Sequence, residues 1–327
     1  MSESKTLDGI KADEWNDYSA NAKVFYSSKI SYSILTTLFQ QSNPDVVYIN
    51  GMFLPIYNWL PLIIAKKQNR KIALAPRGML QQGALAVKPL KKKIFLSLFK
   101  LPGLYKNISW HATDEQEQSD IKKLFGESAD VKIALNIPKA PLKLWTSRSK
   151  SMNELKMVYL SLITEKKNLH LVLEALKEIK TPIVFDIYGP IKDASYWENC
   201  QPLMRNQIHD IQYKGTVNPF EVQDKLQAYH SFILPTKGEN FGHAIYEALS
   251  VGTVPIISPF TPWGNLQQYN AGITVDSWKT EDWAKAVSSM MNFNQEDFNT
   301  LSQNAFTLAK DYFEKNDFKS GYKNLFG

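Results

Sequence analysis

The sequence lacks the features that define several classes of protein. It has one cysteine, Cys200, which excludes an internal disulfide and is typical of a reducing compartment. No window is apolar enough for a membrane-spanning helix, and the polar start MSESKTLDG does not resemble a signal peptide. Arginine is scarce and no nucleic-acid motif is present, which argues against a nucleic-acid partner. We therefore expect a cytoplasmic protein.

Length and pattern indicate an α/β protein of two domains. A chain of 327 residues is too long for one typical core, and 44% hydrophobic with 21% charged residues is ordinary for a globular protein. Short β-branched runs alternate with helical patterns, which predicts parallel sheets flanked by helices. The predicted fold is two Rossmann-like domains whose sheets face each other across a cleft.

The alternation is interrupted once, at 136–151, where prolines and polar residues replace any clear periodicity. We place the linker there and predict domains at 1–140 and 151–308, followed by a helical tail at 309–327. The strands expected on either side are Ala22–Tyr26, Asp45–Asn50, Lys71–Ala75, Ile108–Ala112, Val131–Ala134, Lys156–Leu160, Pro182–Tyr188, Ser231–Pro235 and Val254–Ser258. Helices are expected at Ser31–Gln41, Glu115–Phe125, Asn168–Ile179 and Glu296–Phe313.

The net charge of +6 is concentrated in the Lys88–Lys106 region. Its lysines are interleaved with apolar residues, of which Ile94, Phe95, Leu98 and Phe99 fall on one helical face. One interpretation is a solvated lysine face over an ordinary core stripe. The other is a peripheral contact with the inner face of the cell membrane, through anionic lipid or a lipid-linked acceptor.

The strongest chemical motif is the segment from Leu234 to Glu247, in which a buried strand leads through a glycine-bearing loop into a helix. Glycines 238 and 242 let the backbone approach a ligand, and a helix N-terminus attracts an anion. Glu239 and Glu247 stand eight positions apart, and a carboxylate can accept hydrogen bonds from two hydroxyls of a sugar or ribose. A plain helix start with acidic residues near its dipole is the structural alternative.

This motif resembles the signature of retaining family 4 glycosyltransferases, the bacterial glycosyltransferases of group 1. The similarity includes Glu239, Glu247 and the following 248–258, and it extends to Thr261-Pro-Trp263, Ala75-Pro-Arg-Gly-Met-Leu80 and Trp110-His-Ala-Thr-Asp-Glu115. The resemblance implies a GT-B fold, a nucleotide-sugar donor, and a glycan or lipid-linked acceptor, with a role in surface polysaccharide synthesis. It also implies a C-terminal tail that packs back toward the first domain.

The resemblance assigns roles residue by residue. Catalytic roles fall to Glu239 at the transferred sugar, Lys167 at the diphosphate leaving group, and His111 facing the cleft; for His111 and Arg77 a structural role remains open. The other implied donor-binding residues are Glu247, Asn240, Phe241, Gly242, His243, Lys166, Gly189, Arg77 and Thr261. No Asp-x-Asp motif occurs, which agrees with a metal-independent site that needs no cofactor and uses cationic side chains to stabilise the leaving group.

Two departures from the family pattern bear on activity. The family usually has arginine five residues before the phosphate lysine, where this chain has Leu162. The first convincing strand comes only near Ala22, so the first β-loop-α unit is expected to be missing. These features favour an alternative, a catalytically weakened nucleotide-sugar-binding protein. A nicotinamide-dependent enzyme is disfavoured, because no Gly-x-Gly-x-x-Gly follows an early strand. The donor sugar, its nucleotide, the acceptor and the linkage stay open.

Overall fold

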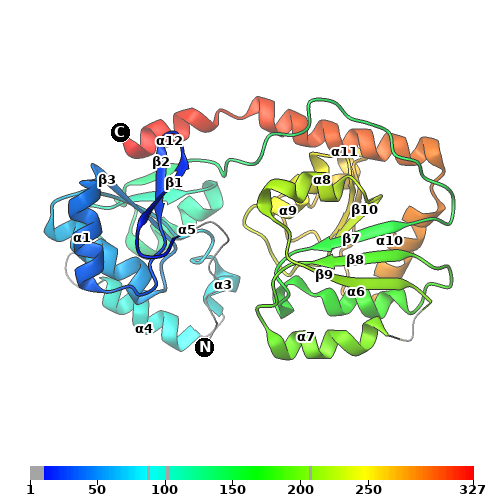
Figure 1. Ribbon diagram of the computed structural model, residues 1–327, viewed down its shortest axis with the longest axis horizontal. Helices are drawn as coiled ribbons and strands as arrows, with labels where there is room; N and C mark the ends of the chain where they lie inside the picture. Colours follow the sequence, from blue (N-terminus) through cyan, green and yellow to red (C-terminus); the bar gives the residue numbers. More distant parts are fainter. Residues whose placement is uncertain (1–10, 87–88, 101–103, 206–207) are drawn as a thin grey trace. The chain divides into compact units, whose positions relative to one another are not determined.

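A computed structural model describes residues 11–86, 89–100, 104–205 and 208–327 of the chain (Figure 1). Within these ranges the chain divides into two compact units. The N-terminal unit comprises the residues up to Leu135 together with Phe318–Gly327, and the C-terminal unit comprises Asn136–Asp317. Residues 1–10 and Lys88, which entered the predictions above, lie outside the described ranges.

The N-terminal unit is built on a four-stranded parallel sheet of order β3-β4-β5-β6. Its strands are β3 (Val46–Asn50), β4 (Lys71–Ala75), β5 (Ser109–Ala112) and β6 (Val131–Ile133). Its helices are α1 (Tyr32–Ser42), α2 (Leu60–Lys67), α3 (Gln82–Ala86), α4 (Pro89–Lys100), α5 (Glu115–Phe125) and α12 (Phe318–Phe326). The buried face of the sheet packs on an aromatic cluster in which Phe99, Trp110 and Phe125 contact one another.

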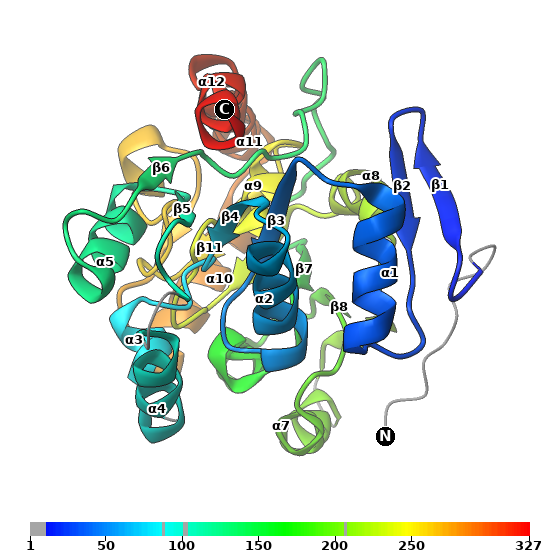
Figure 2. The same cartoon turned by 90° about the vertical axis from the view of Figure 1, so that its left-hand side faces the viewer.

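The strand predicted at Ala22–Tyr26 is confirmed, but the prediction that it belongs to a parallel sheet is wrong. Strands β1 (Trp15–Ser19) and β2 (Ala22–Phe25) form a separate antiparallel hairpin. None of their residues is fully buried, so neither face of the hairpin packs in a core. It lies beside α1 in Figure 2, and the indole N–H of Trp15 donates to the side-chain oxygen of Gln41 at 3.0 Å. A β-branched run alone does not distinguish a hairpin strand from a parallel one.

The C-terminal unit holds a six-stranded parallel sheet of order β12-β11-β10-β7-β8-β9. The strands are β7 (Lys156–Leu160), β8 (Val184–Tyr188), β9 (Asp210–Gly215), β10 (Ser231–Leu234), β11 (Val254–Ile257) and β12 (Ile273–Thr274). The helices are α6 (Leu169–Leu176), α7 (Ala194–Cys200), α8 (Val222–Leu226), α9 (His243–Leu249), α10 (Thr280–Asn292) and α11 (Gln295–Lys315). Helix α6 packs with α7 and α10, and α9 packs with α8 and α11.

Two adjacent interior strands of this sheet, β10 and β11, are buried along their whole length. Such strands read as continuous apolar runs because helices cover both faces of a parallel sheet. The carboxyl ends of parallel strands lie at the same edge, so the loops that follow β7, β8, β10 and β11 gather there. This edge is where the motif residues of the C-terminal unit are found.

The segment predicted as a linker is anchored on the C-terminal unit. The Arg148 guanidinium donates to the carbonyl oxygens of Val251 (3.2 Å) and Gly252, to Thr253 Oγ1 (3.1 Å) and to Ser302 Oγ (2.9 Å). Three of these acceptors lie in the turn that follows α9, and Ser302 lies in α11, so the guanidinium joins both to the segment. Burial lowers the pKa of this guanidinium to about 10. The segment therefore forms part of the unit's structure.

We expect Arg148→Ala to lower the free energy of unfolding by about 2 to 4 kcal/mol, because it removes four hydrogen bonds of a largely buried guanidinium and its packing over the Phe298 ring. Urea titration followed by circular dichroism measures the change. Arg205→Ala, at an exposed position of the same unit, is the matched control and should change stability by less than about 0.5 kcal/mol. A loss below about 1 kcal/mol for Arg148→Ala would contradict the anchoring role.

The apolar residues of α4 lie on two faces of the helix, not on the single face that the sequence predicts. Phe99 is buried and Phe95 packs against the core of the N-terminal unit. Leu90, Ile94 and Leu98 point the other way, with 70%, 53% and 46% of their surface exposed. They are four residues apart and so form one stripe along the helix. This stripe is flanked by exposed lysines at 91, 93 and 100.

No helix in the described part of the chain is both long and apolar enough to cross a membrane.

Candidate active site

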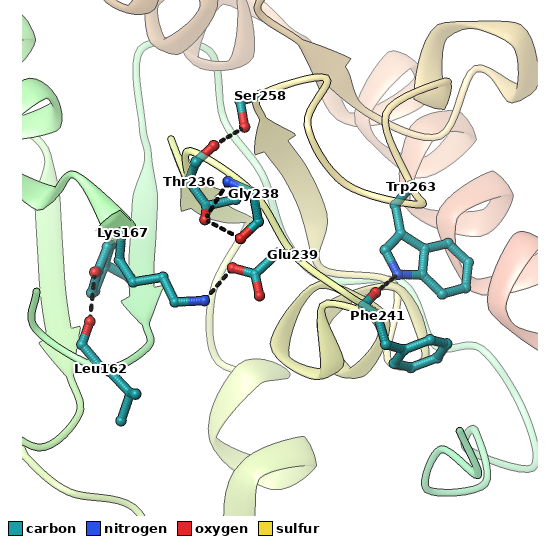
Figure 3. Close-up of polar contacts among 9 residues, drawn as sticks. Leu162, Lys167, Thr236, Gly238, Glu239, Phe241, Ser258 and Trp263 are labelled. Atoms are coloured by element: carbon teal, nitrogen blue, oxygen red, sulfur yellow. Dashed lines mark hydrogen bonds and ion pairs between the residues drawn. The ribbon is translucent and has the colours of Figure 1, made fainter. Parts of the chain in front are cut away.

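The loop between β10 and α9 is held from its buried side. Ser258 Oγ donates to the carbonyl oxygen of Thr236 at 2.5 Å, and the backbone N–H of Gly238 donates to Thr236 Oγ1 at 3.3 Å (Figure 3). Gly238 and Gly242 have φ of +153° and +78°, values that favour glycine. Both glycines singled out in the sequence thus shape the turn that presents Glu239.

Lys167 and Glu239 form an ion pair at this edge of the sheet (Figure 3). Their side chains are 15% and 13% exposed, so the pair is largely withdrawn from solvent. The backbone N–H of Glu239 donates to the carbonyl oxygen of Phe260 at 3.0 Å, which fixes its loop to the one after β11. The pair places a cation and a carboxylate side by side, which suits a ligand carrying both phosphate oxygens and hydroxyls.

An aromatic cluster supports the same loop from inside the unit. The indole N–H of Trp263 donates to the carbonyl oxygen of Phe241 at 2.7 Å (Figure 3). The buried Phe241 ring packs on Tyr246, Trp263 and Tyr312. Thr261 Oγ1 accepts from the backbone N–H of Trp263 at 3.2 Å, so its side chain braces this turn. Phe241 and Thr261 therefore hold the loop in position through the core.

Glu247 lies in α9, about one helical turn after its first residue, His243, and its side chain is half-buried. Burial raises the pKa of this carboxyl to about 7, against a smaller lowering by the Lys139 ammonium. Among the described residues, no side chain or backbone group donates a hydrogen bond to this carboxylate. A half-buried acceptor without a protein donor is available to a ligand that carries hydroxyl groups.

The loops after β7 and β8 meet at Gly189. Its φ is +139°, and a Cβ atom there would lie 1.8 Å from the carbonyl oxygen of Ser161, so only glycine fits. The next residue along the first loop, Leu162, is 44% exposed. Partial burial lowers the pKa of Lys166, while the nearby Glu239 raises it. An exposed leucine thus stands where the family pattern has a cation.

Arg77 and His111 belong to a hydrogen-bonded chain in the N-terminal unit. Arg77 Nη2 donates to the Tyr48 hydroxyl at 2.8 Å, and this hydroxyl lies 2.7 Å from His111 Nδ1. His111 Nε2 lies 2.7 Å from the carbonyl oxygen of Ala134, which can only accept, so Nε2 carries the proton. Burial lowers the pKa of His111, which favours this neutral form. Both ring nitrogens are occupied, and the side chain is fully buried.

Glu117 is a residue of this region that our reading of the sequence missed. Its fully buried carboxylate accepts from the backbone N–H of Gly78 at 2.6 Å and from the N–H and hydroxyl of Thr113 at 2.8 and 2.7 Å. It thereby fixes the loop in which Arg77 has a φ of +54°. The sequence carries a signal for it, because Asp114 followed three positions later by a glutamate is the capping-box pattern, although the Glu117 carboxylate binds the N–H of Thr113 and not that of Asp114.

Three further predicted residues, Asn240, Gly242 and His243, follow Glu239 up to the first turn of α9. Gly242 is the N-cap of α9, and Asn240 precedes it in the same loop. His243 is exposed, with its ring 4.7 Å from that of Phe241. Lys167, Glu239 and their loop neighbours are thus brought together, Glu247 stands apart on α9, and Arg77 and His111 belong to the other unit.

Within the described residues, no group of three or more His, Cys, Asp or Glu side chains is placed to hold a metal ion. The ammonium groups of Lys166 and Lys167 lie beside this loop and could meet an anion.

Comparisons with known proteins give the family. Residues 146–307 match the sequence profile of the glycosyl transferases group 1. The chain is 24% identical over 174 residues to the GtfA subunit of a UDP-N-acetylglucosamine–peptide N-acetylglucosaminyltransferase from Limosilactobacillus reuteri subsp. suis. This alignment covers 49% of the chain and 32% of the relative, so the chain spans about a third of that protein's length.

Two solved structures are similar over most of the chain. Anabaena Alr3699/HepE, in complex with UDP and glucose, superposes with a TM-score of 0.69 at 13% identity, covering 90% of this chain and 80% of that one. Sucrose-phosphate synthase from Thermosynechococcus elongatus superposes with a TM-score of 0.72 at 13% identity, covering 98% and 87%. At such identities the likeness establishes the fold. Residues 146–307 therefore belong to the glycosyl transferases group 1, and the chain has the GT-B fold of two Rossmann-like domains.

Proposed function

We propose that the chain transfers a sugar from a uridine diphosphate sugar to a glycan or lipid-linked acceptor, in the synthesis of a surface polysaccharide. The observation that carries the proposal is the Lys167–Glu239 pair together with the unpartnered carboxylate of Glu247, both inside the segment that belongs to the family. The choice of nucleotide rests on the relatives: HepE was crystallised with UDP and glucose, and the name of the L. reuteri protein specifies UDP-N-acetylglucosamine.

In the proposed reaction each group has one task. Glu247 accepts hydrogen bonds from the ribose hydroxyls, and Glu239 accepts them from the transferred sugar. Lys167, assisted by Lys166, stabilises the negative charge that develops on the diphosphate as the bond from the anomeric carbon to phosphate oxygen breaks. The acceptor hydroxyl bonds to the anomeric carbon from the same side and passes its proton to the departing phosphate, so the configuration is retained. His111 receives no proton-transfer step, because neither ring nitrogen is open.

A thermal-shift screen with UDP-, GDP- and ADP-sugars tests the donor site. We expect stabilisation by the UDP series alone, because a ligand that binds only the folded state stabilises it by about 2.7 kcal/mol at a hundredfold excess over Kd. The shift should be unchanged by EDTA, since lysine supplies the positive charge, and lost in Glu247→Ala. If no nucleotide sugar raises the melting temperature, the proposed activity is withdrawn.

The exposed Leu162 favours a second candidate, a nucleotide-sugar-binding protein with little turnover. The two candidates differ in how Leu162→Arg behaves. If the chain is an enzyme that lacks one phosphate donor, the variant should raise kcat by about tenfold or more, because a single donor to the leaving group has an effect of that order. Binding without turnover in both forms would favour the second candidate.

The exposed stripe Leu90, Ile94 and Leu98 supports a peripheral membrane contact through α4. An apolar stripe between lysines suits the boundary between headgroups and acyl chains of an anionic leaflet. We expect co-sedimentation with phosphatidylglycerol vesicles but not with phosphatidylcholine vesicles. Ile94→Glu should weaken it about tenfold or more. Leu144→Glu, at another exposed leucine, is the control, and equal loss in both variants would contradict a specific role for α4.

A further inference from the structure

A cavity of the C-terminal unit lies next to the loop that carries Glu239. Its volume is about 570 Å³, and it opens between the start of α6 and the loops after β10, β11 and β12. Its walls include Asn168, His170, Lys237, Phe260, Trp278 and Thr280. None of these residues carries a role in the proposed donor site.

One wall of the cavity is an exposed aromatic platform. The rings of Phe260 and Trp278 are stacked, with centroids 5.5 Å apart and planes inclined by 10°. They are 49% and 45% exposed, although both are large apolar side chains at a concave surface. Parallel rings of this kind offer a flat apolar face, which matches the face of a pyranose ring formed by its C–H groups. An exposed apolar patch rimmed by polar groups marks a binding surface.

The other walls supply hydrogen-bonding groups suited to hydroxyls. The side chains of Asn168, His170 and Thr280 make no hydrogen bond with any other residue in the described ranges. Asn168 offers both donors and an acceptor, and the other two offer at least one of each. Two charged side chains also line the cavity, and each has a partner: Lys237 is paired with Glu165 at 2.8 Å and Glu174 with Lys177 at 2.9 Å. A flat apolar platform with uncommitted neutral polar groups is the composition expected for an uncharged carbohydrate.

The cavity is connected to the proposed reaction through two backbone hydrogen bonds. The N–H of Glu239 donates to the carbonyl oxygen of Phe260 at 3.0 Å, and the N–H of Lys237 donates to that of Lys166 at 2.9 Å. Phe260 of the platform therefore stands next to Thr261 in the loop after β11, and Lys237 of the cavity lies in the loop that carries Glu239. A sugar held on the platform contributes binding energy away from the reacting atoms.

We propose that the cavity lined by Phe260 and Trp278 is a subsite for a sugar unit of a glycan acceptor. The proposal rests on the glycosyltransferase activity proposed above and extends it, because it requires an acceptor of more than one sugar. The nucleotide base is the competing occupant, since it also stacks on aromatic rings. Its expected location is near Gly189 and Glu247, neither of which lines this cavity.

Saturation-transfer NMR with three linear probes tests the subsite: cellotetraose, maltotetraose and tetra-N-acetylchitotetraose. Stacking on an aromatic platform tolerates different sugars, so we expect at least one probe to bind with a Kd of about 10 mM or tighter. Trp278→Ala should weaken binding about tenfold or more, whereas Tyr269→Ala, at a half-exposed aromatic outside the cavity, should not. Failure of all three probes, or equal binding by Trp278→Ala, overturns the proposal.

A UDP thermal shift on the same variants separates this proposal from the proposed function. Trp278→Ala should bind UDP as the wild type does, and it should raise the acceptor KM without changing the donor Kd. Loss of the UDP shift in Trp278→Ala assigns the platform to the nucleotide and overturns the subsite alone. If the wild type binds a tetrasaccharide but no nucleotide sugar, the donor site fails and the carbohydrate site stands.

Discussion

Glu247→Gln should raise the free energy of unfolding near pH 8 by about 3 kcal/mol more than it does near pH 4. The cause is the burial that raises the pKa of this carboxyl from 4.5 to about 7. Between these two values the unfolded chain loses the proton while the folded protein keeps it. The folded state then binds more protons, so the free energy of unfolding of the wild type falls as the pH rises through this window.

The glutamine variant removes this titration and keeps the shape of the side chain. Urea denaturation of both proteins at several pH values measures the difference, which should be absent below the unfolded pKa and complete above the folded one. Glu198→Gln, at an exposed carboxylate of α7, is the control and should differ from the wild type by less than about 0.5 kcal/mol. A difference that does not change with pH would contradict the burial of Glu247 as the cause.

The same variant should lose donor affinity while it gains stability. Hydrogen bonds from two ribose hydroxyls to a carboxylate are charge-assisted, and their loss corresponds to about 10- to 100-fold in Kd. Isothermal titration with UDP measures this change. Opposite effects on stability and binding are typical of a functional site, since a half-buried charge lowers stability until a ligand satisfies it.

Lys167→Ala should lower kcat by about 10²- to 10³-fold, because it removes the cation that meets the charge developing on the leaving group. The donor Kd should change much less, since the interaction strengthens as the bond breaks. Lys192→Ala, at an exposed lysine of the same unit, should leave both constants unchanged. A kcat within about threefold of the wild type would assign the phosphate role elsewhere.

Because Lys167 is ion-paired with Glu239, the stability of Lys167→Ala must be measured together with its kinetics. Lys167→Ala leaves the Glu239 carboxylate largely buried without its cation, which lowers the free energy of unfolding for a reason unrelated to catalysis. Adding Glu239→Gln to this variant removes the uncompensated charge and should restore stability. The stability of the double variant measures the structural contribution of the pair, whereas kcat is taken from Lys167→Ala alone, because Glu239 itself contacts the transferred sugar in the proposed reaction.

The α/β class and most of the strands could be predicted from the sequence, because buried parallel strands are apolar throughout and separated by helical periods. Strands β4 and β7 and helix α5 match the predicted ranges residue for residue. The hairpin β1–β2 and the exposed stripe of α4 could not be predicted. A β-branched run carries no information about its partner strand. Likewise, the helical spacing of apolar residues does not tell which of them face the core and which face solvent.

The glycines of the loop and the Glu239–Glu247 spacing could likewise be read from the sequence, and Lys167 was identified by the resemblance to the family. Their electrostatic state was decided by tertiary structure. Only the folded chain pairs Lys167 with Glu239, leaves Glu247 unpartnered, and encloses His111 between Tyr48 and Ala134. These contacts join strands and loops far apart along the chain. Burial and pairing depend on distance in space, whereas the sequence determines directly only what lies within a few residues.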